Sequence, residues 1–116
     1  MGEEMISTAS WQTSVEALDF EQVTVDATSG GVGLTSTKYA PSGSPPRNVA
    51  RISVDTAAIK VTEDGTAPTS ALGDTYAAGD QFIVSGVNSL RKLRMIRTTS
   101  TSGVINVTYY IARGQN

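Results

Sequence analysis

Side chains that usually carry enzymatic chemistry are scarce in this sequence. It contains no histidine and no cysteine. Histidine is the commonest general base and metal ligand at neutral pH, and serine or cysteine nucleophiles need a neighbouring base. A serine–lysine pair is conceivable, but Lys38, Lys60 and Lys92 lie in no motif of that kind. Paired carboxylates for sugar hydrolysis need a deep cleft, which a domain of 116 residues built from short strands scarcely offers. We therefore expect no catalytic residues and no enzymatic activity.

Motifs for binding metals or phosphates are also weak. Asp64, Asp74 and Asp80 fall in expected loops, but their spacing does not match the dense oxygen ligands of a calcium loop. The glycine-rich run at 30–33 is followed by a strand-like stretch, whereas a phosphate-binding loop requires a helix there. The sequence predicts no cofactor and no metal site.

The strongest charge cluster lies near the C-terminus. Nucleic-acid phosphates would attract such a cluster, but the chain carries a net charge of −2 and only 6% aromatic residues. A protein interface or a solvated edge is therefore favoured over nucleic acid. The cluster comprises Arg91, Lys92, Arg94 and Arg97.

Charge is divided between the two ends of the chain. Residues 1–37 hold six acidic residues and no base, whereas residues 88–116 hold five basic residues and no acid. Segments of opposite charge can pair within one fold or between neighbouring copies. Both arrangements are consistent with the sequence.

Composition indicates one folded domain. Domains cluster at about 100–150 residues, and this chain has 116, of which 39% are apolar and 17% charged. Disordered chains usually combine low hydrophobicity with high net charge. No apolar stretch approaches the ~18 residues of a membrane span, and no basic-then-apolar leader opens the chain. We expect a protein made in the cytoplasm, with no membrane association.

Short apolar alternations separated by Gly, Pro and Ser predict an all-β fold. The predicted class is a single antiparallel β-sandwich or jelly-roll-like barrel over residues 15–116, with a Pro/Ser/Gly loop at 41–46. Turns are expected at 63–68 and 76–80, a hairpin turn at 98–103, and a loop with one helical turn at 86–90. The expected strands lie at about 20–27, 32–39, 50–54, 57–61, 81–85, 93–97 and 104–112.

Two of these strands fit a hairpin with a two-residue turn at residues 55–56. In that register Ile52 lies opposite Ile59, and all apolar side chains share one face. Arg51 then lies opposite Lys60 on the outer face. Like charges at that position favour an acidic segment or a partner protein nearby, unless the side chains splay into solvent.

Residues 1–14 are predicted to form an extended N-terminal arm, in which Trp11 is the only large side chain. Tryptophan offers a large rigid apolar surface and is enriched at interfaces. Trp11 is therefore either an anchor in a partner's pocket or a lid on the protein's own core.

Five segments of the second half follow one another in a characteristic order: 50–54 (ARISV), 59–69 (IKVTEDGTAPT), 76–80 (YAAGD), 93–97 (LRMIR) and 106–110 (NVTYY). Through them, residues 49–112 resemble a family of small virion proteins of tailed bacteriophages. The resemblance implies a β-sandwich, often jelly-roll-like, similar to head decoration (cement) proteins and other accessory virion components. It implies no catalytic residues.

From the resemblance we expect a non-enzymatic capsid decoration protein that binds the major capsid protein and stabilises the head. Its expected location is the virion, at the capsid surface, after synthesis in the bacterial host. A homo-oligomer is expected, with a trimer favoured. Two alternatives remain: a tail, neck or fibre component, and a small carbohydrate-binding sandwich. The expected interface residues are Trp11, Arg51, Lys60, Arg91, Lys92, Arg94 and Arg97.

Overall fold

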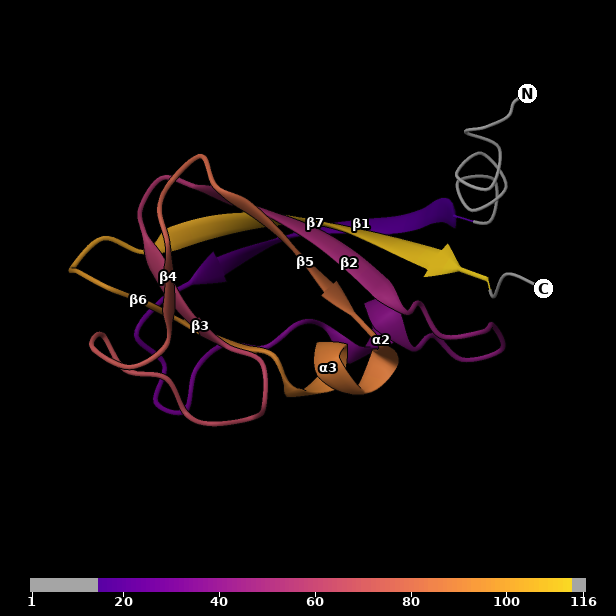
Figure 1. Cartoon of the computed structure of the whole chain (residues 1–116), viewed down its shortest axis with the longest axis horizontal. Coiled ribbons are helices and arrows are strands. Elements are labelled where there is room, and N and C mark those ends of the chain that lie inside the picture. The colour runs from indigo at the N-terminus through magenta and orange to yellow at the C-terminus, as the bar shows by residue number, and fades with distance from the viewer. Residues whose placement is uncertain (1–14, 114–116) are drawn as a thin grey trace, which may run out of the picture.

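The computed structural model describes residues 15–113, and their fold is all-β, as predicted. The described elements form two antiparallel sheets with two short helices (Figure 1). The elements are β1 (Val15–Val25), α2 (Ser36–Tyr39), β2 (Val49–Asp55), β3 (Ile59–Thr62), β4 (Asp74–Tyr76), β5 (Gln81–Ser85), α3 (Val87–Lys92), β6 (Arg94–Arg97) and β7 (Gly103–Ala112).

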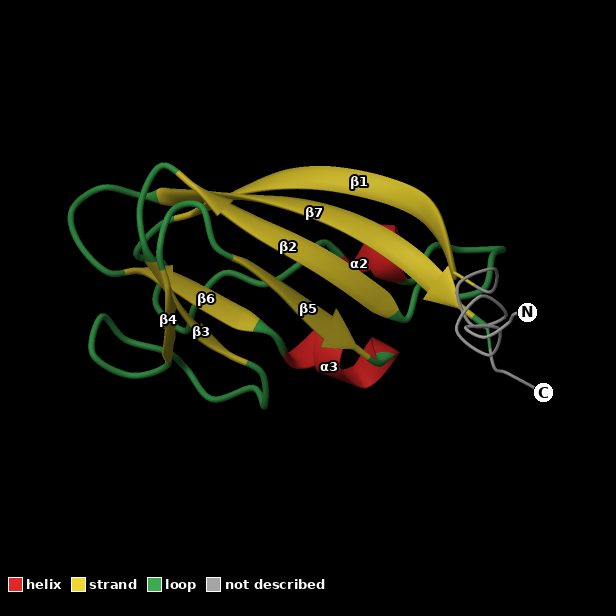
Figure 2. Cartoon of the chain, turned by 45° about the horizontal axis from the view of Figure 1, so that its top comes forward, coloured by secondary structure: helices red, strands yellow, loops and turns green. Residues whose placement is uncertain are grey.

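The larger sheet has four strands in the order β1-β7-β2-β5, and the smaller has three in the order β4-β3-β6. The large sheet lies over the small sheet at one end and over α2 and α3 at the other (Figure 2). One face of the large sheet is therefore covered, and its opposite face is not covered by any described element. The predicted arm at residues 1–14 lies outside the described residues, as do residues 114–116.

The core lies between these layers and follows the predicted alternation. Along β7, Ile105, Val107 and Tyr109 are fully buried, while the residues between them are only half-buried. The same alternation places side chains from both sheets in one cluster. Because each buried aliphatic side chain is worth about 1.5–3 kcal/mol, this pattern dominates the choice of face. The other strand residues of the core include Ala50, Ile52, Val54, Ile59, Val61, Val84 and Met95.

The predicted hairpin at 50–61 is wrong. β2 pairs with β5 and β7 in the large sheet, whereas β3 pairs with β4 and β6 in the small one. Ile52 is opposite Phe82 and Val107, so it does not pair with Ile59. Thr56, with a positive φ of 74°, lies in the connection that carries the chain from one sheet to the other. Both arrangements bury the same side chains, and the alternation alone does not distinguish them.

Close packing of the two sheets explains why position 103 is a glycine. A Cβ on Gly103, the first residue of β7, would lie 2.5 Å from Cγ2 of Ile59 and 2.8 Å from the carbonyl oxygen of Ala57. Only glycine lets the large sheet approach the β2–β3 connection this closely. The two sheets are also joined by Tyr76 of β4, whose ring stacks on Phe82 of β5 at a centroid distance of 4.1 Å.

Two further expectations are corrected. The predicted strand at 32–39 is reduced to a single bridge between Val32 and Met95, and residues 36–39 form α2. Residues 98–103 do not close a hairpin, because β6 and β7 belong to different sheets. By contrast, β5 spans the predicted residues 81–85, and the predicted helical turn is α3.

Candidate protein interface

The open face of the large sheet carries a set of apolar side chains at one end. Residues directly opposite each other in a sheet point to the same side. Val15 is opposite Ala112, Ala17 is opposite Tyr110, and Tyr110 is also opposite Val49. We call this set the apolar patch, and it consists of Val15, Ala17, Phe20, Val49, Ile83, Tyr110 and Ala112.

Exposure sets the apolar patch apart from an ordinary surface. Ile83 is 62% exposed and Phe20 is 54% exposed. A hollow of about 240 Å³ runs over part of the patch and is lined largely by apolar atoms of Val15, Val49, Ile83 and Tyr110. Single exposed hydrophobic residues need no explanation, but a contiguous group on a rigid surface is typical of an interaction site.

The other end of the same face is polar, and its side chains form hydrogen bonds with one another. Gln22 donates a hydrogen bond to Oδ1 of Asn106 at 3.0 Å, and Asn106 donates to Oδ2 of Asp55 at 2.8 Å. These three side chains connect β1, β7 and β2. The open face is thus divided into a hydrogen-bonded polar half and the apolar patch.

Among the described residues that line the hollow of the apolar patch, Arg51 is the one that carries a charge. It lies opposite Ile83 of β5 and Thr108 of β7 and is exposed. Its predicted neighbour Lys60 belongs to the small sheet, where it lies opposite Thr75 and donates a hydrogen bond to its hydroxyl. The expected conflict between Arg51 and Lys60 therefore does not exist. Among residues 15–113, no carboxylate forms an ion pair with Arg51.

The predicted basic cluster does not form a single surface. Arg94 donates to the carbonyl oxygens of Leu93 and Arg91, at 3.0 and 3.3 Å, and so satisfies the C-terminal end of α3. Arg91 donates to Asn88 within the same helix, and Lys92 is exposed beside it. Arg97 lies at the far end of β6, where it lines a separate groove. Trp11 lies outside the described residues.

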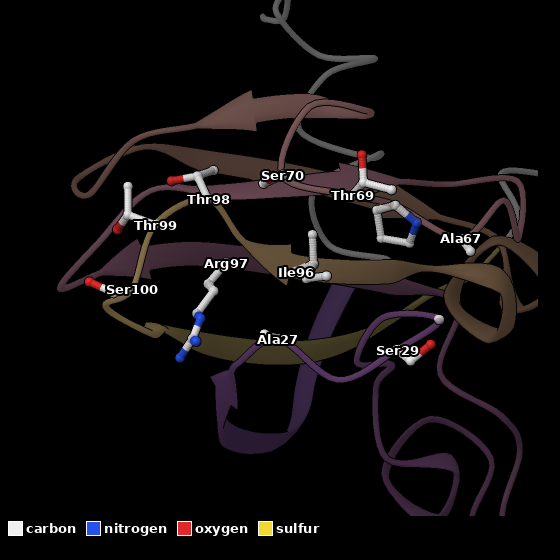
Figure 3. A pocket seen from close by; sticks show the side chains of 12 residues that line it. Ala27, Ser29, Ala67, Thr69, Ser70, Ile96, Arg97, Thr98, Thr99 and Ser100 are labelled. Carbon is white, nitrogen blue, oxygen red and sulfur yellow. The ribbon is translucent and has the colours of Figure 1, made fainter.

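That groove has a volume of about 680 Å³ and is formed by residues 27, 29–30, 67–70 and 96–100. Figure 3 shows Thr99 and Ser100 at one end and Thr69 toward the other. Hydroxyl groups and one guanidinium can bind polar groups. None of the lining residues is aromatic, although aromatic rings are the usual platform for a sugar, so the groove does not favour the carbohydrate alternative.

Acidic residues of β1 form ion pairs with the neighbouring α2 and with the residue that follows β7. Asp19 pairs with Lys38 of α2 at 3.1 Å, and Glu16 pairs with Arg113 at 3.6 Å. The backbone N–H of Phe20 and the Lys38 ammonium hold the pKa of Asp19 below its ordinary value. Such exposed pairs each contribute about 0–1 kcal/mol. Among the described residues, the opposite charges of the two chain ends therefore form an ion pair within the fold between Glu16 and Arg113.

The carboxylates in loops accept hydrogen bonds from residues close to them in the sequence. The hydroxyl and backbone N–H of Thr28 lower the pKa of Asp26, and Thr66 lowers that of Asp64. These are turn-forming contacts. Within residues 15–113, no three Asp, Glu, His or Cys side chains gather as a metal site would require. The described helices are too short and too polar to span a bilayer.

Comparison with protein families, with curated proteins and with solved structures finds no match to this chain.

Sequence reasoning missed the apolar patch, although two signals pointed to it. Residues 82–84 form a continuous apolar run where a strand with one buried face would alternate, so either Ile83 or the pair Phe82 and Val84 had to face outward. Phe20 lies between acidic residues of an edge strand. Neither signal shows that these side chains meet, because they come from strands more than 60 residues apart in sequence.

Proposed function

We propose that this protein is a non-enzymatic structural protein that attaches to another protein through the apolar patch. The observation that supports this most directly is the exposure of Phe20 and Ile83 on one rigid face. Protein interfaces combine an apolar centre, often with aromatic side chains, and a polar rim. Here Tyr110 lies at the centre of the patch, and the Gln22–Asn106–Asp55 hydrogen bonds lie beside it.

The setting that we propose is the particle of a tailed bacteriophage, with the protein as a capsid decoration protein that binds the major capsid protein. This part of the proposal depends on the resemblance of residues 49–112. A capsid repeats the same binding site many times, and linked contacts within a trimer would add through their effective concentration. A modest patch on each subunit would then suffice for stable attachment.

Co-sedimentation of the purified protein with undecorated capsids of the phage that encodes it tests this proposal. We expect binding at a fixed number of copies per capsid. Ile83→Thr should lower the affinity by roughly tenfold, or about 1.4 kcal/mol, because it removes much of a large, strongly exposed apolar side chain from the proposed interface. Threonine keeps the β-branched shape, so the strand itself should tolerate the change.

Gln81→Thr is the matched control, since Gln81 is exposed on the same strand and the same face but outside the apolar patch. It should bind as the parent protein does. Failure to bind capsids, together with stoichiometric binding to tail or neck complexes, would replace the decoration role with the tail alternative. Equal affinity of the two variants would remove the apolar patch from the proposal.

A further inference from the structure

We propose that the two edge strands of the large sheet bind each other in neighbouring copies of this chain. In this arrangement β5 of one copy pairs with β1 of the next, and the copies close into a ring. The occupant of each edge is therefore a second copy of the protein. This inference depends on the strand order and on the charges of the two edges, and it does not depend on the phage setting or on binding to a capsid.

The first argument is that both edges of the large sheet are open. The sheet ends at β1 on one side and at β5 on the other (Figure 2), and no strand within residues 15–113 pairs with the outer edge of either. Lysine, proline or a bulge usually protects such an edge, because its unpaired backbone groups can bind another strand. Neither strand contains lysine or proline. The register shift between Ala17 and Asp19 leaves β1 regular from Asp19 to Val25, so both edges can accept a further strand.

The second argument is strand direction. Each neighbouring pair in the order β1-β7-β2-β5 is antiparallel, so β1 and β5 run in opposite directions. A second copy in the same orientation places its β1 antiparallel to β5 of the first copy. The antiparallel pattern then continues from one copy to the next. Such a head-to-tail interface forms a ring when the rotation from copy to copy completes a circle.

The third argument is the match between side chains on the two edges. Phe20 lies in one row across the sheet with three opposed residues, Thr108, Arg51 and Ile83. Within one copy, three strand spacings of about 4.8 Å, or about 14 Å in total, separate Phe20 from Ile83. If the row continues into the next copy, their Cβ atoms come within about 4.5–5.5 Å. This contact joins two strongly exposed hydrophobic side chains, Ile83 at 62% and Phe20 at 54%.

The fourth argument is charge, which distinguishes this pairing from the pairing of identical edges. The sequence of β1 contains acidic residues and no base, whereas β5 and the following α3 contain basic residues and no acid. Pairing of β1 with β1, or of β5 with β5, brings like charges together. Pairing of β5 with β1 brings opposite charges together, which favours the head-to-tail arrangement. The acids are Glu16, Asp19 and Glu21, and the bases are Arg91 and Lys92.

Charge on both edges remains available for a neighbouring copy. Glu16 and Asp19 each have a basic partner in the same copy. Glu21 accepts hydrogen bonds from neutral groups, and no cation within residues 15–113 pairs with it. Arg91 and Lys92 are exposed, and among the described residues neither forms an ion pair. Glu21 points to the covered face of the sheet, which is the side on which α3 packs.

Two single-cysteine variants test the pairing, because the chain has no cysteine of its own. Gln22 and Gln81 lie in one row, separated by Asn106 and Ser53, so the ring places Gln81 of one copy beside Gln22 of the next. An equimolar mixture of Gln22→Cys and Gln81→Cys, oxidised mildly, should give a disulfide-linked dimer that contains one chain of each variant. Each variant oxidised alone should remain unlinked.

Light scattering over a range of protein concentrations supplies a second measurement. The unmodified protein should show one mass that is a fixed multiple of the monomer mass. A protein that stays monomeric would overturn the proposal, and a mass that keeps rising with concentration would overturn the closed ring. Disulfide-linked dimers of either variant alone would show that identical edges pair, which also contradicts the proposal. Circular dichroism of both variants establishes that they remain folded.

These outcomes are separate from those of the capsid experiment. A monomer that binds capsids would overturn the ring and leave the proposed attachment intact. A ring that binds no capsid and no other part of the particle would overturn the attachment and leave the edge pairing intact.

Discussion

The phenolic hydroxyl of Tyr109 donates a hydrogen bond to the Glu21 carboxylate on the neighbouring strand β1. Tyr109 is fully buried, whereas Glu21 is half-buried at the border of the core. The same carboxylate accepts from the hydroxyl of Thr35 at 2.6 Å and from its backbone N–H at 3.2 Å. Glu21 thereby joins β7 and β1 to the segment that leads into α2, and it satisfies a buried polar group.

Removing the Tyr109 hydroxyl should weaken this junction. Hydrogen bonds to charged groups contribute about 1.5–3 kcal/mol, so Tyr109→Phe should lower the free energy of unfolding by an amount in that range or slightly below it. Glu21 keeps its contacts with Thr35. Urea denaturation followed by circular dichroism measures the change.

Tyr110→Phe is the matched control for that experiment. Tyr110 is the next residue of the same strand, but it points to the open face, and no hydrogen bond of its hydroxyl is present among the described residues. The free energy of unfolding should stay within about 0.5 kcal/mol of the parent value. Equal destabilisation by both substitutions would contradict the role assigned to the Glu21 contact.

The same junction predicts a loss of stability in alkali. Burial first, and then the hydrogen bond to Glu21 and its negative charge, raise the pKa of Tyr109 above its ordinary value of 10.0. The folded state therefore retains this proton at a pH where the unfolded state has lost it. The corresponding stability is fully present below pH 10.0 and declines as the pH rises above that value.

Denaturation curves of the parent protein and Tyr109→Phe at increasing pH measure this effect. The difference in unfolding free energy between the two proteins should be constant near neutral pH and should shrink above the ordinary tyrosine pKa. Comparing the two proteins removes the contribution of lysines, which titrate in the same range. A difference that does not vary with pH would show that Tyr109 ionises equally in both states.

Cysteine cross-linking tests the strand pairing that replaced the predicted hairpin. Because the chain has no cysteine of its own, the two introduced thiols are the only ones in each molecule. Arg51→Cys with Thr108→Cys places two thiols directly opposite each other on β2 and β7. Opposed strand residues have Cβ atoms about 4.5–5.5 Å apart, close to the range of a disulfide.

We expect this pair to form an intramolecular disulfide on mild oxidation, detected by mass spectrometry of a proteolytic digest. Arg51→Cys with Lys60→Cys should remain reduced, because those residues lie in different sheets. The opposite result would restore the hairpin register in which residues 51 and 60 face each other.

The sequence by itself determined which side chains enter the core. Alternation in β2, β3 and β7 selected Ile52, Ile59 and Val107 for burial, and all three are fully buried. Alternation has this power because successive side chains of a strand point to opposite faces, and burial of one face outweighs local preferences. The boundaries of β5 followed instead from the turn and the loop expected on either side of residues 81–85.

Only the tertiary structure decided which strands are neighbours. β2 ends at Asp55 and β3 begins at Ile59, so the two strands are consecutive in the chain, yet they belong to different sheets. An alternating pattern specifies a face and not a partner, so a hairpin and a crossing between two layers bury the same residues. The apolar patch depends on that choice, because Phe20, Ile83 and Tyr110 share a surface only through the order β1-β7-β2-β5.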